Sequence, residues 1–175
     1  MMSSIVIAIF LLSIGASFVQ RTTGFGFGIF IMTMLPFFLP TYGEATTLSG
    51  LLAITTSAVI VWRLREYVTW LRLWPILLTF MVVSTIAIFA LTRIDDHILR
   101  LILGMALIII SIYFAVFSQQ IKLPTTKHVQ VGAGTLSGLM GGFFGMQGPP
   151  AVLYFIQSEP TKEHYIAMAQ TYFLL

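Results

Sequence analysis

The chain has 175 residues, of which 58% are hydrophobic and only 9% charged, and its mean hydropathy is +0.96. Soluble domains carry roughly a quarter charged residues, so this composition excludes an ordinary soluble domain and indicates an integral membrane protein. The absence of cysteine excludes disulfides and thiolate metal sites, and a net charge of +3 without any basic tract argues against a nucleic-acid partner.

Hydrophobic regions alternate with short charged connections along the whole chain. Charge-free runs cover residues 22–43, 45–62, 73–92, 101–121 and 128–158. Each is close to the ~20 residues that cross a lipid bilayer as a helix. The N-terminal run lacks the basic n-region of a signal peptide, so we expect it to be retained. The sequence therefore predicts an all-α, polytopic membrane protein with the lipid bilayer as its surroundings.

The first region, residues 5–39, is interrupted by the stretch QRTTGFGFGIF, which begins at Gln20 and places glycine at positions 24, 26 and 28. Non-helical backbone at membrane depth survives only where protein or a wet cavity satisfies its polar groups. Glycine permits unusual backbone angles and lets a ligand approach the main chain. A half-helix starting near Gly28 would point free amides and a partial positive charge into the break, which suits an anion.

Arg21 is the only charge inside either interrupted region of the chain. One interpretation makes it the electrostatic partner of a bound anion, and the other makes it an interfacial anchor whose side chain reaches the membrane surface. Two interpretations also remain open for Gln20, Thr22 and Thr23, which could donate hydrogen bonds to a ligand or satisfy freed backbone groups.

Residues 45–62, 73–92 and 98–117 are predicted to be uninterrupted spanning helices. The connection between the first two contains Arg63, Arg65 and Arg72 against one acid, together with all three tryptophans. Basic residues favour the cytoplasmic side and tryptophan the interface, so this loop is predicted to be cytoplasmic. Two crossings later, Lys122 and Lys127 should lie on the same side.

The fifth region, residues 129–157, is interrupted by GGFFGMQGPPAVLYF, and a sixth begins near Glu163. Pro149 and Pro150 suit the first turn of a half-helix, where a missing N–H matters little. Gln147 and Gly148 precede them and would face the ligand. Gly134 and Gly138, spaced by four, are expected to let two helices pack closely.

The two interrupted regions occupy matching positions. Gly26 and Gly145 are 119 residues apart, Pro40 and Pro160 are 120 apart, and Glu44 and Glu163 are again 119 apart. We interpret this as an internal repeat, with residues 1–123 as the first unit and residues 124–175 as the start of the second. The second unit would then need ~65 further residues. Without them, a homodimer would have to complete any path across the membrane.

The length of the first region leaves two arrangements open. Residues 5–39 number 35, whereas one crossing needs ~20 residues and a full hairpin ~40. A single crossing would make the repeats parallel, and a short V would make them inverted. We favour inverted repeats, because broken helices at matching positions of two halves are typical of a transporter site at the membrane midplane.

No catalytic constellation competes with a binding function. The chain lacks the pairs or triads needed for hydrolysis, a zinc site or a nucleotide fingerprint, so we expect no enzyme activity, no metal and no cofactor. The predicted anion site comprises charge and hydrogen-bond donors, exposed backbone and half-helix prolines: Gln20, Arg21, Thr22, Thr23, Gly24, Gly26, Gly28, Gly145, Gln147, Gly148, Pro149 and Pro150.

Two stretches of the chain resemble the signatures of the sulfite exporter TauE/SafE family: FVQRTTGFGFGIFIMTMLPFFLP and GTLSGLMGGFFGMQGPPAVLYFIQSEPTKEHYIAMAQTYF. The resemblance is most specific at GPPAVLY followed by PTKE. It implies a multi-pass transporter of the bacterial-type inner membrane that exports sulfite, thiosulfate or organosulfonates. Arg21 stands where the family often has a small residue, which would tune charge selectivity. The alternative is a non-transporting assembly or accessory protein whose glycine regions serve helix packing.

Overall fold

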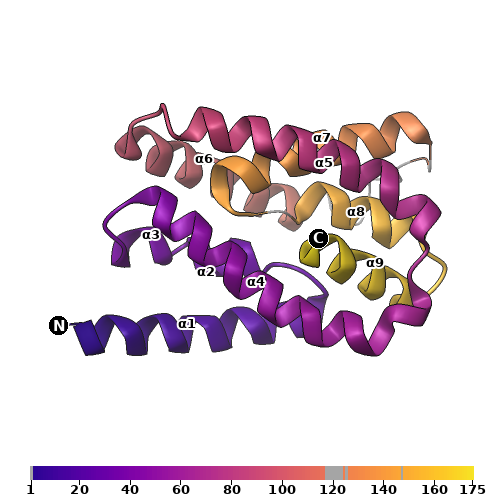
Figure 1. Ribbon diagram of the computed structural model, residues 1–175, viewed down its shortest axis with the longest axis horizontal. Coiled ribbons are helices and arrows are strands. Elements are labelled where there is room, and N and C mark those ends of the chain that lie inside the picture. Colours follow the sequence, from indigo (N-terminus) through magenta and orange to yellow (C-terminus); the bar gives the residue numbers. More distant parts are fainter. Residues whose placement is uncertain (1, 117–123, 125, 147) are drawn as a thin grey trace.

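The computed structural model describes residues 2–116, 124, 126–146 and 148–175, and every element in these ranges is helical (Figure 1). In chain order the elements are α1 (Met2–Thr23), α2 (Phe27–Met32), α3 (Leu35–Phe38), α4 (Tyr42–Leu64), the 3-10 turn η1 (Arg65–Tyr67), α5 (Trp70–Leu91), α6 (Asp96–Val116), α7 (Lys127–Phe144), α8 (Pro149–Ser158) and α9 (Lys162–Leu174). The predicted all-α fold is confirmed.

Three described segments are long and apolar enough to cross a membrane, namely Ile5–Thr23, Tyr42–Tyr67 and Trp70–Leu91. Many of their large apolar side chains are exposed, including Phe18 at 70% and Leu71 at 87%. Since soluble proteins rarely expose large contiguous apolar surface, these faces are suited to lipid. The prediction of a membrane protein is therefore confirmed as well. Lys122, used above for orientation, lies outside the described residues.

The chain doubles back directly after α1. Phe30 lies against Gly15, and Gly26 lies against Val19, so α2 packs antiparallel to α1. Figure 1 shows the same return, from the end of α1 through α2 and α3 to the start of α4. The first region therefore forms the short V considered above, while the repeat and the inverted relation of its units stay predictions.

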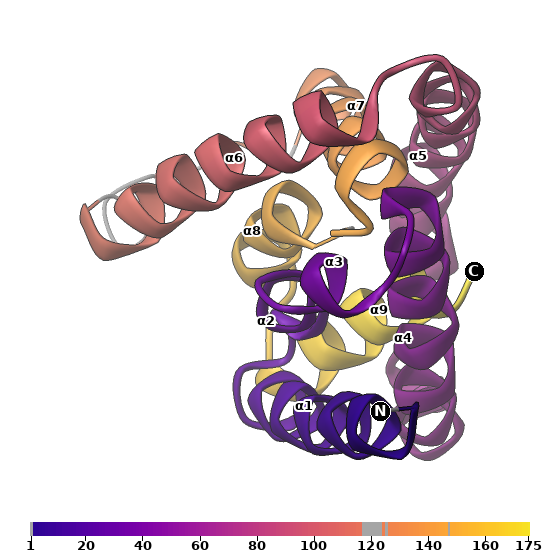
Figure 2. The same cartoon turned by 90° about the vertical axis from the view of Figure 1, so that its left-hand side faces the viewer.

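Figure 2 looks along the long axis and shows α6 projecting away from the other helices. In contrast, α9 lies deep in the bundle, where it packs mainly on α4 and α8. Every residue from 167 to 173 is buried. A helix that is buried on all sides must satisfy its polar side chains with protein partners.

Threonine caps define the starts of α4 and α9. The Thr41 hydroxyl accepts a hydrogen bond from the Glu44 amide at 3.2 Å, and the Thr161 hydroxyl accepts one from the His164 amide at 3.4 Å. Glu44 and Glu163 lie in the first turns of these helices, where the helix dipole favours negative charge.

Two hydrophobic clusters divide the buried core. One joins α5, α7, α8 and α9 and contains Phe80, Phe155 and Tyr172. The other joins α1, α2, α3, α4 and α6 and contains Ile31, Leu35 and Leu103. The two broken regions lie where these clusters meet, so each break can contact residues of both.

Glycines let α7 pack directly on α5. A Cβ added at Gly134 would lie 2.7 Å from the Ile76 carbonyl oxygen, and one at Gly138 would lie 2.8 Å from Cβ of Val83. Gly142 continues the same face one turn later, against Ser84 and Ala87. The packing role expected for Gly134 and Gly138 is thus seen in the structure, and it matches the small-residue interfaces of membrane helices.

Gly138→Ala is expected to destabilise the protein by about 1–3 kcal/mol, because the new methyl group must force α5 and α7 apart. Gly132→Ala is the matched control on the same helix, since nothing lies within 4 Å of a Cβ there. Thermal unfolding in detergent should show a lower Tm for the first variant and an unchanged or higher Tm for the second. Equal Tm values would contradict this account of the interface.

An ion pair joins the start of α5 to the end of α8. The Arg72 guanidinium donates to the Ser158 carbonyl at 2.8 Å and lies 3.5 Å from Oε1 of Glu159. The Glu159 side chain is fully buried, whereas that of Arg72 is 48% exposed. The Oε2 atom of Glu159 has no hydrogen-bond partner among the described residues. Glu159 therefore depends on Arg72 for charge compensation.

Arg72→Met is expected to destabilise the protein by about 3 kcal/mol, because it leaves a buried carboxylate unpaired. The double variant Arg72→Met/Glu159→Met should recover most of that loss, since both members of the pair are then apolar. Chemical denaturation of the two single variants and the double variant gives the coupling energy. Additive single effects would show that the pair does not act as a unit.

Candidate functional site

The first break is three residues long and turns on two glycines. Helix α1 ends at Thr23, and α2 starts at Phe27. Between them Gly24 has φ +83° and Gly26 has φ +95°, angles in the left-handed region that side chains with a Cβ resist. The amides of Phe27, Gly28 and Ile29 form the first turn of α2 and have no intrahelical acceptor. These three donors are available to a ligand.

Helix α9 satisfies the carbonyl groups of the same break. The Tyr165 hydroxyl donates to the Thr23 carbonyl at 2.6 Å, and Nε2 of Gln170 donates to the Gly24 carbonyl at 2.9 Å. Unpaired carbonyls would present negative partial charge to any anion nearby. The two hydrogen bonds from α9 therefore leave the break richer in donors than in acceptors.

The second break closes α7 and opens α8. Gly145 has φ +63°, its amide donates to the Gly141 carbonyl at 3.0 Å, and the Met146 amide donates to the Met140 carbonyl at 3.3 Å. This is the usual glycine termination of a helix. Helix α8 then begins with Pro149 at its first position.

The first turn of α8 has few donors left. Pro149 and Pro150 have no N–H, and the Ala151 amide donates to the Ser137 hydroxyl on α7 at 3.1 Å. The Val152 amide donates to the Gly148 carbonyl at 2.9 Å. The two breaks thus differ chemically: the first offers backbone donors, whereas the start of α8 contributes mainly its dipole and apolar surface.

The two breaks touch each other through backbone. A Cβ added at Gly28 would lie 2.7 Å from the Gly145 carbonyl oxygen and 3.2 Å from Cα of Met146. Side chains from each break also pack into the opposite cluster. Met146 is buried in the cluster of α1, α2, α3, α4 and α6, and Phe25 packs against the cluster of α5, α7, α8 and α9. The contact therefore requires glycine at position 28.

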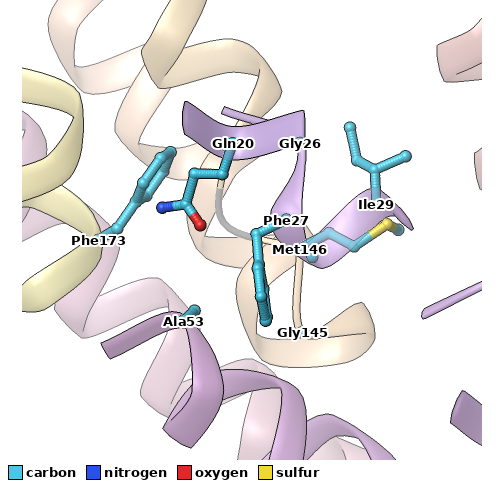
Figure 3. A pocket seen from close by; sticks show the side chains of 10 residues that line it. Gln20, Gly26, Phe27, Ile29, Ala53, Gly145, Met146 and Phe173 are labelled. Carbon is cyan, nitrogen blue, oxygen red and sulfur yellow. The ribbon is translucent and has the colours of Figure 1, made fainter. Parts of the chain in front are cut away.

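A small cavity lies where the breaks meet (Figure 3). Its volume is about 20 Å³, close to the ~10–15 Å³ that one water needs and too small for a multi-atom oxyanion. Figure 3 shows the Gln20 amide between the rings of Phe27 and Phe173 in this view. The lining residues come from α1, α2, both breaks, α4 and α9: Gln20, Gly26, Phe27, Gly28, Ile29, Ala53, Gly145, Met146, Gly148 and Phe173.

Gln20 is held by three side-chain hydrogen bonds. Its Nε2 donates to the Ser57 hydroxyl at 3.1 Å and to Oε1 of Gln170 at 2.7 Å. Its Oε1 accepts from the Thr56 hydroxyl at 3.0 Å. Gln20 is 1% exposed, so these bonds supply the partners that a buried amide requires.

The structure brings together only part of the predicted set. Gln20, Gly26, Gly28, Gly145 and Gly148 line the cavity. Gln147 lies outside the described residues, and the other six predicted residues do not line this cavity.

The remaining predicted residues have local environments of their own. Arg21 is exposed and lines a separate cleft with α4. Thr22 and Thr23 are exposed, and their hydroxyls donate to the Val19 carbonyl one turn earlier. Gly24 is buried beneath Tyr165. Pro149 and Pro150 line an apolar groove of about 510 Å³ beside α6 and α7.

Several residues of this site were missed by sequence reasoning: Phe27, Ile29, Ala53, Thr56, Ser57, Met146, Tyr165, Gln170 and Phe173. Gln170 had a usable signal, because a glutamine inside the apolar stretch YIAMAQTYF needs a buried partner. No sequence signal distinguishes Ser57 and Thr56 from the other small polar residues of α4. Among the described residues no group of three or more histidine, aspartate or glutamate side chains could hold a metal ion.

Comparison with known proteins gives one match. A family model described as "Sulfite exporter TauE/SafE" matches residues 9–175. No curated protein and no solved structure matches the chain.

Gln170→Met is expected to destabilise the protein by about 1–3 kcal/mol, because it leaves the Gly24 carbonyl without its donor and removes one partner of Gln20. Thr135→Val is the control: its hydroxyl bonds only to the Val131 carbonyl of its own helix, so its loss should change stability little. Thermal unfolding of both purified variants makes the comparison. A Gln170→Met protein as stable as the parent would show that this hydrogen bond is unimportant to the break.

Proposed function

The chain belongs to the sulfite exporter TauE/SafE family, and on that premise we propose that it is a secondary transporter of small sulfur-containing oxyanions. Sulfite, thiosulfate and organosulfonates are the proposed substrates, and export across a bacterial-type inner membrane is the proposed direction. Transport would proceed by alternating access around the two breaks. The family is one of transporters rather than enzymes, which agrees with the absence of a catalytic constellation from the sequence.

One observation carries the proposal: the cavity between the breaks is lined by the residues whose amides open α2. Phe27, Gly28 and Ile29 each contribute to its wall. Free amides and the positive end of a helix dipole stabilise oxyanions without a formal positive charge. A site of this kind binds an anion firmly enough to select it and weakly enough to release it.

In the proposed mechanism, the described geometry is a state whose cavity is too narrow for the anion. The cavity holds about 20 Å³, and the backbones of Gly28 and Gly145 lie in close contact beside it. An oxyanion could enter only if the two breaks moved apart. Each break packs a side chain into the hydrophobic cluster opposite its own, namely Phe25 and Met146. Movement of the breaks would therefore couple the two clusters, as alternating access requires.

A second candidate function is supported by the interface between α5 and α7. Gly134, Gly138 and Gly142 serve close helix packing, and an assembly or accessory protein would need nothing more. Gly28 also serves a close contact, with Gly145, but it differs from these three glycines because it lines the cavity. The two functions can therefore be separated by comparing glycines from the two places.

Purified protein in liposomes is expected to move sulfite, thiosulfate or a sulfonate under a proton gradient. Gly28→Ala should lower the flux at least tenfold, because its methyl group would occupy the contact between the breaks. Gly50→Ala is the matched control, since nothing lies within 4 Å of a Cβ there. No flux of any of these anions in either direction would refute the substrate assignment. A loss of flux strictly proportional to lost folded protein would favour the packing function.

A further inference from the structure

A second, larger hollow lies near the small cavity, in a cleft between α1 and α4. Its volume is about 250 Å³. Helix α1 contributes Ser17, Gln20 and Arg21 to its wall, and α4 contributes Thr55, Thr56 and Val59. The cleft is thus more than ten times as large as the cavity. Five of its seven lining residues have polar side chains, and the other two are Val59 and Ile60.

The charged side chain of Arg21 is the feature of the cleft that favours water over lipid. Arg21 is exposed and makes no hydrogen bond or ion pair with any described residue. A charged side chain within a membrane-length segment faces protein partners or a hydrated cavity. Since no partner is present in the described part of the chain, water or a mobile anion must solvate the guanidinium.

Gln20 is the only described residue that lines both the cleft and the cavity. Its amide is therefore the partition between them. The Gln20 amide is held by Thr56 and Ser57 of α4 and by Gln170 of α9. A change in the separation of α1, α4 and α9 would break these bonds together and join the two hollows.

We propose that the cleft between α1 and α4 is the water-filled antechamber through which the anion reaches the cavity. The Gln20 side chain is its gate, and Arg21 is the residue that concentrates anions at the mouth. Arg21 is then a selectivity residue outside the binding site instead of a direct ligand within it. This inference rests on the proposed transport function, but it concerns access and can be measured without any flux.

The antechamber also reconciles the two interpretations of Arg21. The residue lies in the last turn of α1, where a cation is favoured by the helix dipole. In the same place it raises the local concentration of anions by electrostatic attraction in a confined cleft. At this position Arg21 can stabilise the end of α1 and also attract the anionic substrate.

The natural absence of cysteine makes access directly measurable. Three single variants of the full chain in liposomes are compared: Val59→Cys in the cleft, Ala53→Cys in the cavity wall and Val82→Cys on the apolar face of α5. The probe is an anionic sulfonate methanethiosulfonate added from water. Val59→Cys should be labelled at least tenfold faster than Val82→Cys, whose side chain is 61% exposed but lines no described hollow. Equal rates would overturn the antechamber.

The gate is tested by adding a second substitution to Ala53→Cys. Gln20→Ala should raise labelling at this position at least tenfold, because the partition is removed. Thr56→Val is a milder alternative that deletes one hydrogen bond to Gln20 while keeping a side chain of similar shape, and it should raise labelling by a smaller factor. Labelling of Ala53→Cys that is already fast with Gln20 in place, or unchanged in both double variants, would refute the gate.

The role of Arg21 is tested by the charge of the reagent. In the Val59→Cys chain, Arg21→Gln should slow the anionic reagent about tenfold relative to a cationic reagent of the same size. Arg21→Lys should preserve the ratio, and high salt should reduce it. An unchanged ratio in Arg21→Gln would refute recruitment by Arg21. Failure of the proposed transport function would look different, because flux would be absent while the labelling pattern persisted.

Discussion

The requirement that shapes this protein is the satisfaction of backbone polar groups where helices break inside an apolar bundle. Helix α9 meets it at the first break, since Tyr165 and Gln170 bind the carbonyls of Thr23 and Gly24. At the second break, Ser137 of α7 binds the Ala151 amide. Burial of α9 follows from this role, because a helix that serves a break in another region must lie against it.

The two breaks form one structural unit despite their distance in sequence. Backbone atoms of Gly28 and Gly145 approach closely, while Phe25 and Met146 each pack into the opposite hydrophobic cluster. Packed interiors resist gradual deformation and tend to move between discrete arrangements. An exchange of side chains across the boundary therefore links any movement of one cluster to the other.

Composition and residue pattern were enough to predict the all-helical membrane fold, because apolar runs of membrane length are a local property of the sequence. The side-chain partners were harder to predict. Gln20 faces inward, and successive residues of a helix are ~100° apart, so Arg21 must point elsewhere while α1 continues to Thr23. Gln170 could not be assigned to Gln20 from sequence, since the two are 150 residues apart and only tertiary packing joins them.

The Ser137 bond and the two prolines at the start of α8 have a consequence for the orientation of a guest. Among the described residues, Phe27, Gly28 and Ile29 of the first turn of α2 line one part of the cavity, and the apolar side chains of Met146 and Phe173 line another. The cavity therefore has two chemically different sides, one formed by the start of α2 and one by apolar side chains. On the proposed transport function, and once the breaks have moved apart, a sulfonate carrying a carbon substituent would bind with its oxygens toward α2 and its substituent toward the thioether and the ring, whereas inorganic sulfite has no such tail to align.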